Sequence, residues 1–291
     1  TLISQRRGAQ RPSSKNVSDK SRERNVSISA LKLRNIGPAF LSGRIADIAV
    51  HPKNNSVWYV AVGSGGVWKT ENSGTTWKPI FDKESSYSIG CITIDPSNHS
   101  TLWVGTGENV GGRHVGYGDG IYKSTDGGKS WKNVGLKFSE HISKVIVHPH
   151  NSDIVWVAAQ GPLWSKGGER GLYKTIDGGK SWKKVLGGNE WTGVTELVID
   201  PRNPDVLYAA TWQRHRTVAA LMGGGPDSGL HKSTDGGETW RELTTGLPRS
   251  NMAKIGLAIS PQKPDVLYAA IELDRKKGAV YRSENRGASW K

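Results

Sequence analysis

The letters GGKS at 127–130 match the end of the loop with which nucleotide-binding enzymes hold phosphate groups. The complete motif also requires a glycine six residues before its lysine. Here that position is Lys123, and in a second copy of the letters, at 178–181, it is Lys174. A third turn, at 233–240, has glutamate at 238 in place of the lysine. The sequence therefore excludes a phosphate-binding loop of this kind.

What does recur is the order Ser/Thr-x-Asp-x-Gly-x-Ser/Thr-Trp. Five turns follow it, with aspartate or asparagine at the third position: Asn72, Asp126, Asp177, Asp235 and Asn285. A calcium loop needs several carboxylates in series, whereas each of these turns offers at most one at this position. An aspartate in a turn can instead accept hydrogen bonds from nearby backbone N–H groups, and asparagine keeps an acceptor oxygen for this purpose. We therefore predict a structural role for these side chains, and no metal or other cofactor.

The tryptophans of these turns stand at 77, 131, 182, 240 and 290, which defines a repeat of about fifty residues. Each repeat also has a proline-centred turn between two apolar segments, as in TIDPSNHSTLWVGTG at 93–107. Four short strands per repeat are typical of a propeller blade, and Asp-Gly is a strong signal for the last hairpin. The tryptophan is expected to pack between blades. We predict an all-β fold, a β-propeller with five recognisable blades at 31–78, 79–132, 133–183, 184–241 and 242–291.

The repeated turn resembles the Asp-box, or bacterial neuraminidase repeat. The superfamily of that name includes sialidases, xyloglucan-cleaving glycoside hydrolases, sortilin-type receptors and photosystem assembly factors. The stretches IGPAFLSGRIADIAVHP (36–52), GSGGVWKTENSGTTWKPIFD (63–82), YGDGIYKSTDGGKSW (117–131) and AAQGPLW (158–164) are most similar to large bacterial proteins described as sortilin-like or glycosyl hydrolase repeat proteins. The resemblance covers about residues 31–291. It is specific for the fold and says little about activity.

Residues 1–30 are rich in Ser, Arg, Lys and Asn, and we predict a disordered basic leader. LRNIGPAF at 33–40 mirrors WKNVGLKF at 131–138, so residues 31–38 are expected to form a closing outer strand. Lys291 stands one residue into the outer strand of the fifth blade. From these ends we expect the five blades to be the first part of a larger propeller.

The net charge of +14 raises the question of a nucleic-acid partner. Residues 1–35 hold nine lysines and arginines against two acidic residues, which is half of the excess. Many of the remaining lysines and arginines flank the Asp-box turns, as Lys123 and Lys132 do. We predict that these side chains lie on a solvated strand face. We therefore predict that nucleic acid is not the partner. The chain has no apolar run long enough to cross a bilayer, and the lone Cys91 excludes an internal disulfide.

Antiparallel connectivity places the proline turns and the Asp-box turns on one side, which we call the Asp-box face. The loops between the second and third strands of each blade then lie on the opposite side, the variable-loop face. These loops differ widely in length: 63–66, 107–120, 160–171, 211–229 and 272–278. Variable loops on a rigid scaffold are where proteins usually bind ligands.

Three sets of residues on the variable-loop face are candidates for function. Four arginines could bind an anionic ligand, such as a carboxylate or an acidic sugar, or could simply be solvated: Arg44, Arg113, Arg170 and Arg214. Three tryptophans could stack on sugar rings or peptide side chains, or could pack in the core: Trp164, Trp191 and Trp212. Carboxylates that could serve as acid or base are Glu108, Asp119, Glu140, Glu169 and Asp227. The histidines of this face, which lack a metal-ligand spacing, are His114, His141 and His215.

The resemblance to the two groups of hydrolases breaks at the residues that matter most. Sialidases have Arg-Ile-Pro before the first Asp-box, whereas this chain has Arg-Ile-Ala at 44–46, with Tyr117 as a possible nucleophile. In xyloglucan hydrolases the catalytic aspartate typically lies in an Arg-Thr-Asp-Ile-Gly-Gly stretch. The matching stretch here, at 61–66, has Gly63 in place of that aspartate.

From the sequence we therefore expect a secreted or periplasmic propeller that acts as a binding or scaffold module. The sortilin resemblance implies that its variable-loop face takes a peptide, a protein or a glycan. The alternative is a glycoside hydrolase, sialidase-like or glucan-cleaving, with its active site on the same face. A hydrolase would need two carboxyl groups about 5–10 Å apart in an open pocket. The oligomeric state is left open.

Overall fold

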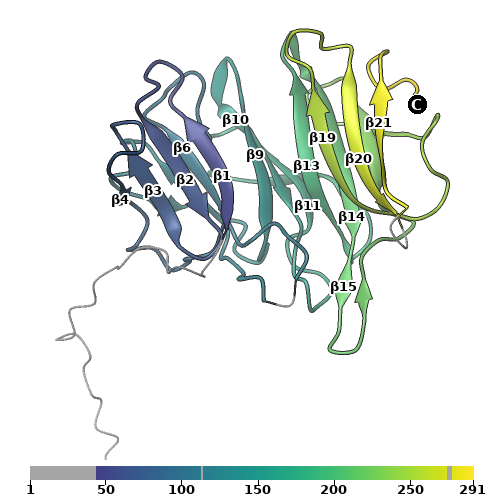
Figure 1. The fold of residues 1–291 in the computed structure, drawn as a ribbon, viewed down its shortest axis with the longest axis horizontal. Helices are drawn as coiled ribbons and strands as arrows, with labels where there is room; N and C mark the ends of the chain where they lie inside the picture. Colours follow the sequence, from purple (N-terminus) through teal and green to yellow (C-terminus); the bar gives the residue numbers. More distant parts are fainter. Residues whose placement is uncertain (1–43, 113, 274–276) are drawn as a thin grey trace, which may run out of the picture. The chain divides into compact units, whose positions relative to one another are not determined.

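The structure is a computed structural model that describes residues 44–112, 114–273 and 277–291. Within these ranges every regular element is a β-strand, and five antiparallel sheets follow one another along the chain (Figure 1). We call these sheets blades one to five. The predicted leader, at 1–30, and the predicted closing strand, at 31–38, lie outside the described residues.

Blade one contains β1 (Ile45–Val50), β2 (Trp58–Val62), β3 (Gly66–Thr70) and β4 (Lys78–Pro79). Blade two contains β5 (Ile89–Ile94), β6 (Leu102–Thr106), β7 (Ile121–Ser124) and β8 (Lys132–Asn133). Blade three contains β9 (Ile142–His148), β10 (Asn151–Ala159), β11 (Gly171–Thr175) and β12 (Lys183–Leu186). Blade four contains β13 (Thr192–Asp200), β14 (Asn203–Gln213), β17 (Gly229–Ser233) and β18 (Arg241–Leu243), with the hairpin β15 (His215–Arg216) and β16 (Leu221–Met222) inserted after β14. Blade five contains β19 (Met252–Ile259), β20 (Leu267–Leu273) and β21 (Ala279–Ser283).

Each blade is a meander in which strands that follow one another in the chain pair side by side. The first strands of consecutive blades contact one another, so that β1, β5, β9, β13 and β19 form the inner row of the five sheets. This is the arrangement of propeller blades. In blade five, Lys291 exchanges backbone hydrogen bonds of 2.8 and 3.0 Å with Arg282, as the first residue of a fourth strand does.

The hydrophobic core is divided into four clusters, each shared by two neighbouring blades. Because a central strand is covered on both faces, β6 (LWVGT) is buried along its whole length rather than at every second residue. The Asp-box tryptophans of later blades join these clusters, as predicted. The ring of Trp131 lies 5.2 Å from that of Phe81 in the preceding blade, and the ring of Trp182 lies 6.3 Å from that of Trp103.

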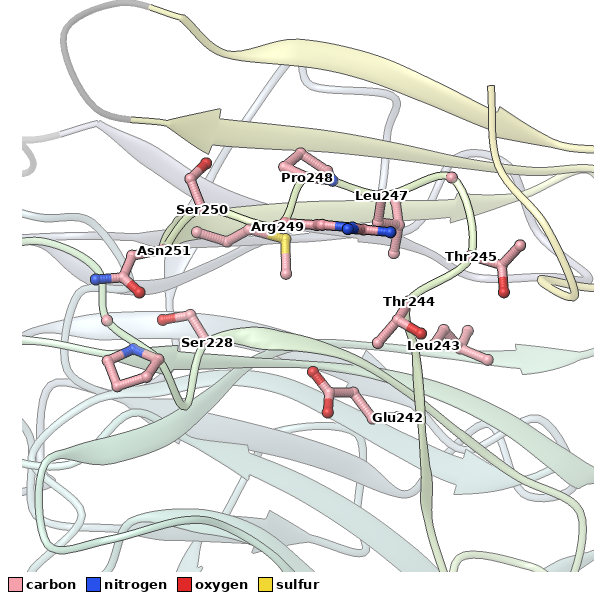
Figure 2. Close-up of a pocket in the computed structure, with 14 residues that line it drawn as sticks. Ser228, Glu242, Leu243, Thr244, Thr245, Leu247, Pro248, Arg249, Ser250 and Asn251 are labelled. Carbon is pink, nitrogen blue, oxygen red and sulfur yellow. The ribbon is translucent and has the colours of Figure 1, made fainter.

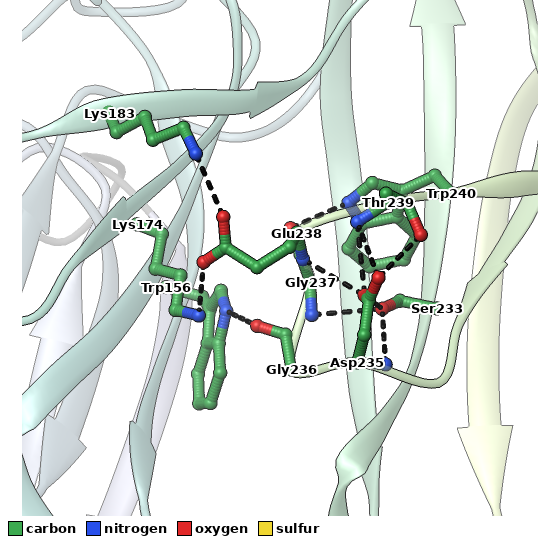
Figure 3. A network of polar contacts seen from close by, with 10 residues as sticks. All are labelled: Trp156, Lys174, Lys183, Ser233, Asp235, Gly236, Gly237, Glu238, Thr239 and Trp240. Atoms are coloured by element: carbon green, nitrogen blue, oxygen red, sulfur yellow. Dashed lines mark hydrogen bonds and ion pairs between the residues drawn. The ribbon is translucent and has the colours of Figure 1, made fainter.

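Each aspartate of the Asp-box turns is hydrogen-bonded within its own turn. The carboxylate of Asp177 accepts the hydroxyl of Thr175 at 2.7 Å and the backbone N–H groups of Lys180 and Ser181 at 2.9 and 3.0 Å. Figure 3 shows the same pattern around Asp235. The turn closes through two residues with positive φ, Gly178 and Gly179 in blade three, which is why glycine is favoured there.

These hydrogen bonds hold the pKa of Asp177 well below its usual value, with the hydroxyl of Ser181 as the largest cause. Asp126 and Asp235 are shifted in the same direction. A depressed pKa in the folded state stabilises the protein above the unfolded value of about 3.9, and this stabilisation is lost as the pH falls toward the folded pKa.

We therefore expect the triple change of Asp126, Asp177 and Asp235 to asparagine to flatten the acid dependence of the unfolding midpoint. At neutral pH it should have little effect, because asparagine already serves in blades one and five: the amide oxygen of Asn72 accepts the N–H of Thr76 at 2.9 Å. The measurement is thermal unfolding at neutral pH and at about pH 3. The matched control changes the same residues to alanine, which should lower the midpoint at both. A triple asparagine variant with the wild-type acid dependence would contradict this role.

A second repeated contact involves an aromatic residue on the second long strand of each blade and the cation directly opposite it on the third. We call each such pair a clasp. The cation lies over the ring, at these distances from the ring centre: Tyr59 and Lys69, 5.6 Å; Trp103 and Lys123, 4.7 Å; Trp156 and Lys174, 5.7 Å; Tyr208 and Lys232, 5.1 Å; Tyr268 and Arg282, 5.9 Å.

The clasps of blades two, three and four bind the Asp-box turn of the following blade. The ammonium of Lys123 donates to the carbonyl of Gly178 at 3.1 Å, and the indole of Trp156 donates to that of Gly236 at 3.1 Å (Figure 3). The side chain of Lys232 donates to the carbonyl of Arg286 at 2.9 Å. For the lysines that precede the turns in these blades, the prediction of a solvated strand face is therefore wrong. They lie over rings of their own blade, Lys123 and Lys232 also donate to carbonyls of the next blade, and Lys232 is only 9% exposed.

Candidate functional site

The variable loops of blades one to four are each hydrogen-bonded to the segment that precedes the first strand of their own blade. The joining backbone hydrogen bonds run from Gly63 to Arg44 (2.9 Å), Gly107 to Ser88 (2.7 Å), Gln160 to His141 (2.8 Å) and Arg214 to Trp191 (3.1 Å). Loop and link together therefore form the variable-loop face, on the opposite side of the blades from the Asp-box turns.

The carboxylate of Glu108 is buried and held by two side chains on this face. Its side chain is 3% exposed and forms an ion pair with Arg44, whose side chain is 42% exposed. The second carboxylate oxygen accepts the hydroxyl of Ser64 at 2.9 Å. Arg44 also donates to the ring nitrogen Nε2 of His114 at 3.1 Å. Glu108 is thus an acceptor already occupied by two donors, and Arg44 reaches solvent beside it.

The same carboxylate fills the space next to Gly63. A Cβ atom at Gly63 would lie 3.1 Å from the carboxyl carbon of Glu108 and 3.3 Å from one of its oxygens. A side chain at position 63 would therefore compete with Glu108 for this space. Position 63, where the xyloglucan hydrolase motif has its aspartate, is thus adjacent to the carboxylate of Glu108 in the next blade.

Two of the four candidate arginines are not on the surface. Arg170 is 1% exposed and donates to the backbone carbonyls of Gly167 at 2.8 Å and of Gln160 at 3.0 Å, which fixes its own loop. Arg214 is 0% exposed and donates to the carbonyl of Gly161 at 3.0 Å. Neither guanidinium is presented to solvent. Arg44 is the one candidate arginine at the surface of the described part of the chain, and Arg113 lies outside that part.

Among the candidate carboxyl groups, Glu140 has an environment suited to a general acid. Burial raises its pKa, an effect that the charges of Arg170 and Arg214 oppose. Its backbone is in the left-handed region, with φ of 53°, a strained conformation that occurs often at functional sites. The adjacent His141 has its pKa lowered to about 3 by burial, so it is neutral at physiological pH, and its Nδ1–H donates to the carbonyl of Glu108 at 2.8 Å.

The other three carboxylates are each engaged in local contacts. Asp119 accepts the hydroxyl of Tyr122 at 2.8 Å, Glu169 accepts the backbone N–H of Phe138 at 2.7 Å, and Asp227 accepts the side-chain amide of Asn189. No hydrogen bond joins any two of the five candidate carboxyl groups in the described ranges.

The three candidate tryptophans differ in exposure. Trp212 is 5% exposed and packs beneath Arg214 and Lys254, at 4.9 and 5.6 Å from the ring centre. Trp191 is half-buried, with the ring of His215 at 4.1 Å. Trp164 is 46% exposed.

Three further aromatic residues of the variable-loop face are exposed: Tyr87, 64%; Tyr117, 73%; and Phe138, 73%. Tyr87 and Phe138 are not among the candidates from the sequence, because they stand in the links between blades and not in the variable loops. The signal was available, since both residues stand shortly before the first strand of a blade, where the link reaches this face.

A cavity of about 800 Å³ lies on this face between blades four and five (Figure 2). Its lining includes the buried side chains of Leu243, Leu247 and Met252. Figure 2 shows Ser228 and Glu242 on one wall and Arg249 on the opposite wall. The cavity thus offers apolar, acidic and basic groups to a small ligand, and its size is in the usual range for such sites.

In the described ranges no three histidine, cysteine, aspartate or glutamate side chains lie close enough to hold a metal ion. The same ranges contain no helix that is long and apolar enough to span a membrane.

Comparison with known proteins agrees with this architecture. The model of the Sortilin-Vps10 family (sortilin, neurotensin receptor 3) matches residues 119–256. The xyloglucanase Xgh74A of Acetivibrio thermocellus is 27% identical over 228 residues, which cover 67% of this chain and 25% of that protein. A xyloglucanase of Hypocrea jecorina is 28% identical over 280 residues, which cover 86% of this chain and 32% of that protein. The chain therefore spans a quarter to a third of the length of these relatives.

Solved structures support the same fold. A GH74 enzyme of Niastella koreensis superimposes with a TM-score of 0.62 at 23% identity, covering 84% of this chain and 37% of that chain. An ancestral GH74 enzyme superimposes with a TM-score of 0.63 at 22% identity, covering 89% and 32%. The predicted β-propeller fold is confirmed, and the chain is similar to proteins of the Sortilin-Vps10 model and to GH74 enzymes. Its resemblance to bacterial sortilin-like and glycosyl hydrolase repeat proteins fits both comparisons.

Proposed function

We propose that the chain is the glycan-binding part of a propeller protein of the glycoside hydrolase type, working outside the cytoplasm. A polysaccharide would lie across the variable-loop face. The observation that carries this proposal is the set of exposed aromatic side chains on that face, formed by Tyr87, Tyr117, Phe138 and Trp164. An aromatic ring offers an apolar face to a sugar ring, and tyrosine and tryptophan add a polar edge that can hydrogen-bond to its hydroxyls.

The charges on this face favour a neutral glycan over an acidic one. Arg170 and Arg214 are buried on carbonyl groups, and Arg44 is paired with Glu108. The names of the similar proteins, which are xyloglucanases, support a neutral glucan as the first ligand to test. A peptide ligand, as the sortilin resemblance implies, has no separate observation in its favour.

Removing the rings at positions 117 and 164 is expected to weaken binding strongly. We expect Trp164→Ala to weaken the binding of xyloglucan oligosaccharides about tenfold, and Tyr117→Ala with Trp164→Ala about 100-fold. Isothermal titration calorimetry measures both, with polygalacturonate as the acidic comparison. The matched control is Ile176→Ala, because Ile176 is 69% exposed but belongs to an Asp-box turn on the opposite face. Binding that is absent, or unchanged in the double variant, would overturn the proposal.

Hydrolysis is the second candidate function, and the place of Glu108 favours it. Its carboxylate lies beside Gly63, the position that matches the catalytic aspartate in the xyloglucan hydrolase motif. Glu108 is held by Arg44 and Ser64, whereas burial raises the pKa of Glu140, as a general acid requires. Release of reducing ends from xyloglucan tests this candidate. Activity should be lost in both Glu108→Gln and Glu140→Gln and retained in Glu169→Gln. A wild-type chain that binds xyloglucan but releases no reducing ends would contradict hydrolysis and leave glycan binding as the proposed function.

A further inference from the structure

The cavity between blades four and five is built by blade four and by the link that leads to blade five. Two stretches of the chain, 225–228 and 242–252, contain all of its lining residues in the described ranges. No residue of β20 or β21 is among them. The cavity is therefore separate from the outward surface of blade five.

Backbone hydrogen bonds hold the walls of the cavity in place. The N–H of Gly225 donates to the carbonyl of Met252 at 3.2 Å, and that of Ser228 donates to the carbonyl of Gly225 at 3.1 Å. On the link, the N–H of Leu247 donates to the carbonyl of Thr244 at 3.1 Å. The cavity is thus formed before a ligand enters it, and a preformed site loses less entropy on binding.

The two ionisable side chains of the lining, Glu242 and Arg249, stand on opposite walls (Figure 2). Neither takes part in an ion pair within the described ranges. His231 lies directly opposite Glu242 in the strand register, but burial lowers its pKa to about 4, so this imidazole is neutral at physiological pH. The carboxyl group and the guanidinium are therefore both free to bind groups of opposite charge on a ligand.

The apolar part of the lining is aliphatic. Leu243, Leu247 and Met252 are all buried. Ser228 adds a polar group on the same wall as the carboxyl group (Figure 2). Its hydroxyl oxygen accepts the N–H at the end of β14 at 2.9 Å and keeps a second lone pair for a ligand.

This lining differs from that of the proposed glycan site. None of the 14 lining residues in the described ranges is aromatic, so a sugar ring would have no ring to stack on. The exposed rings of Tyr87, Tyr117, Phe138 and Trp164 belong instead to blades two and three and the links before them. An aliphatic chain with a charge at each end would meet an opposite charge on either wall and an apolar surface between them.

We propose that this cavity binds a zwitterion whose ammonium and carboxylate groups are joined by a short aliphatic chain, the class of the ω-amino acids. The ammonium group donates to Glu242 and Ser228, and the carboxylate accepts from Arg249. The methylene groups pack on Leu243 and Met252. Because charge-assisted hydrogen bonds form at both ends, binding requires both charges of the ligand.

NMR of the methionine methyl groups tests this proposal, because the chain has only two methionines. Met252 lines the cavity, whereas Met222 lies in β16 of the inserted hairpin. We expect 6-aminohexanoate to move the Met252 signal in a saturable way and to leave the Met222 signal in place. Hexanoate and hexylamine, which each have one charge, should bind at least about tenfold more weakly. A Met252 signal that does not respond, or that responds equally to all three compounds, would overturn the proposal.

Two variants test the walls separately. Glu242→Gln and Arg249→Gln should each weaken the binding of 6-aminohexanoate about tenfold. Both side chains are exposed, so folding should be retained. The matched control is Arg241→Gln, because Arg241 precedes Glu242 in β18 but does not line the cavity, and it should bind as the wild type does. Wild-type affinity in both wall variants would contradict the proposal.

The same proteins distinguish this site from the proposed glycan site. The two wall variants should bind xyloglucan oligosaccharides with the affinity of the wild type, because their side chains lie apart from the exposed rings. A chain that binds xyloglucan but no ω-amino acid would overturn this proposal alone. A Met252 signal that moves with the oligosaccharide and not with 6-aminohexanoate would assign the cavity to the glycan and also overturn it.

Discussion

Replacing Trp156 with alanine is expected to destabilise the protein by about 3–5 kcal/mol, more than any other single change considered for the fold. Trp156 is 1% exposed and packs in the cluster shared by blades three and four. Its indole also donates to the carbonyl of Gly236, and Lys174 lies over its ring. Alanine would leave a cavity and remove one half of the clasp, so the lysine and the Asp-box turn of blade four would lose a partner.

Thermal unfolding measures this effect. A loss of this size should lower the midpoint by about 6–20 °C in a unit of this length. Trp156→Phe is the informative comparison, because it keeps most of the ring and loses the N–H donor, and it should show an intermediate loss. Ile176→Ala, at an exposed position, should leave the midpoint unchanged. A Trp156→Ala variant as stable as the wild type would show that the clasp does not join the blades.

The second large effect is expected at the ion pair of Arg44 and Glu108. Removing one partner of a fully buried pair costs about 3–5 kcal/mol, because the other charge is left without compensation. Since the side chain of Arg44 is 42% exposed, we expect a smaller loss, about 2 kcal/mol, for Arg44→Ala. The carboxylate would then keep only the hydroxyl of Ser64.

A double-mutant cycle separates the charge from the packing. Glu108→Gln retains the shape and the contact with Ser64 but removes the charge. We expect the double variant Arg44→Ala with Glu108→Gln to be more stable than Arg44→Ala alone, because no uncompensated carboxylate remains. The measurement is the free energy of unfolding in urea for the four proteins. If the stability losses of the two single variants add up to that of the double variant, the interaction between Arg44 and Glu108 contributes nothing to stability.

The repeat made most of the fold predictable. The spacing of the five tryptophans and the Asp-Gly turns gave four strands per unit, and the structure has such sheets at β1–β4, β5–β8 and β9–β12. The lysines beside the turns were assigned to a solvated face because a charged residue at a repeated position usually stands there. Sequence spacing within one repeat contains no information about the ring of the same blade and the carbonyl of the next one, and this is where Lys123 and Lys232 lie.

The functional site was less predictable, because burial within loops cannot be read from residue type. Arg170 and Arg214 stand in loops of the predicted face, yet both are buried on backbone carbonyls of those loops. The proximity of Glu108 to Gly63 joins two blades and could be seen only in three dimensions. Which of the predicted residues bind a ligand stays a prediction.

The most direct test of glycan binding on the variable-loop face is an NMR titration of the 12 tryptophan indole N–H signals with a xyloglucan oligosaccharide. Trp164 and Trp77 form the critical pair, since they are 46% and 40% exposed but stand on opposite faces. We expect the signal of Trp164 to move in a saturable way while that of Trp77 stays in place. Movement confined to Trp77 and the other Asp-box tryptophans, or no movement at all, would contradict glycan binding on the variable-loop face.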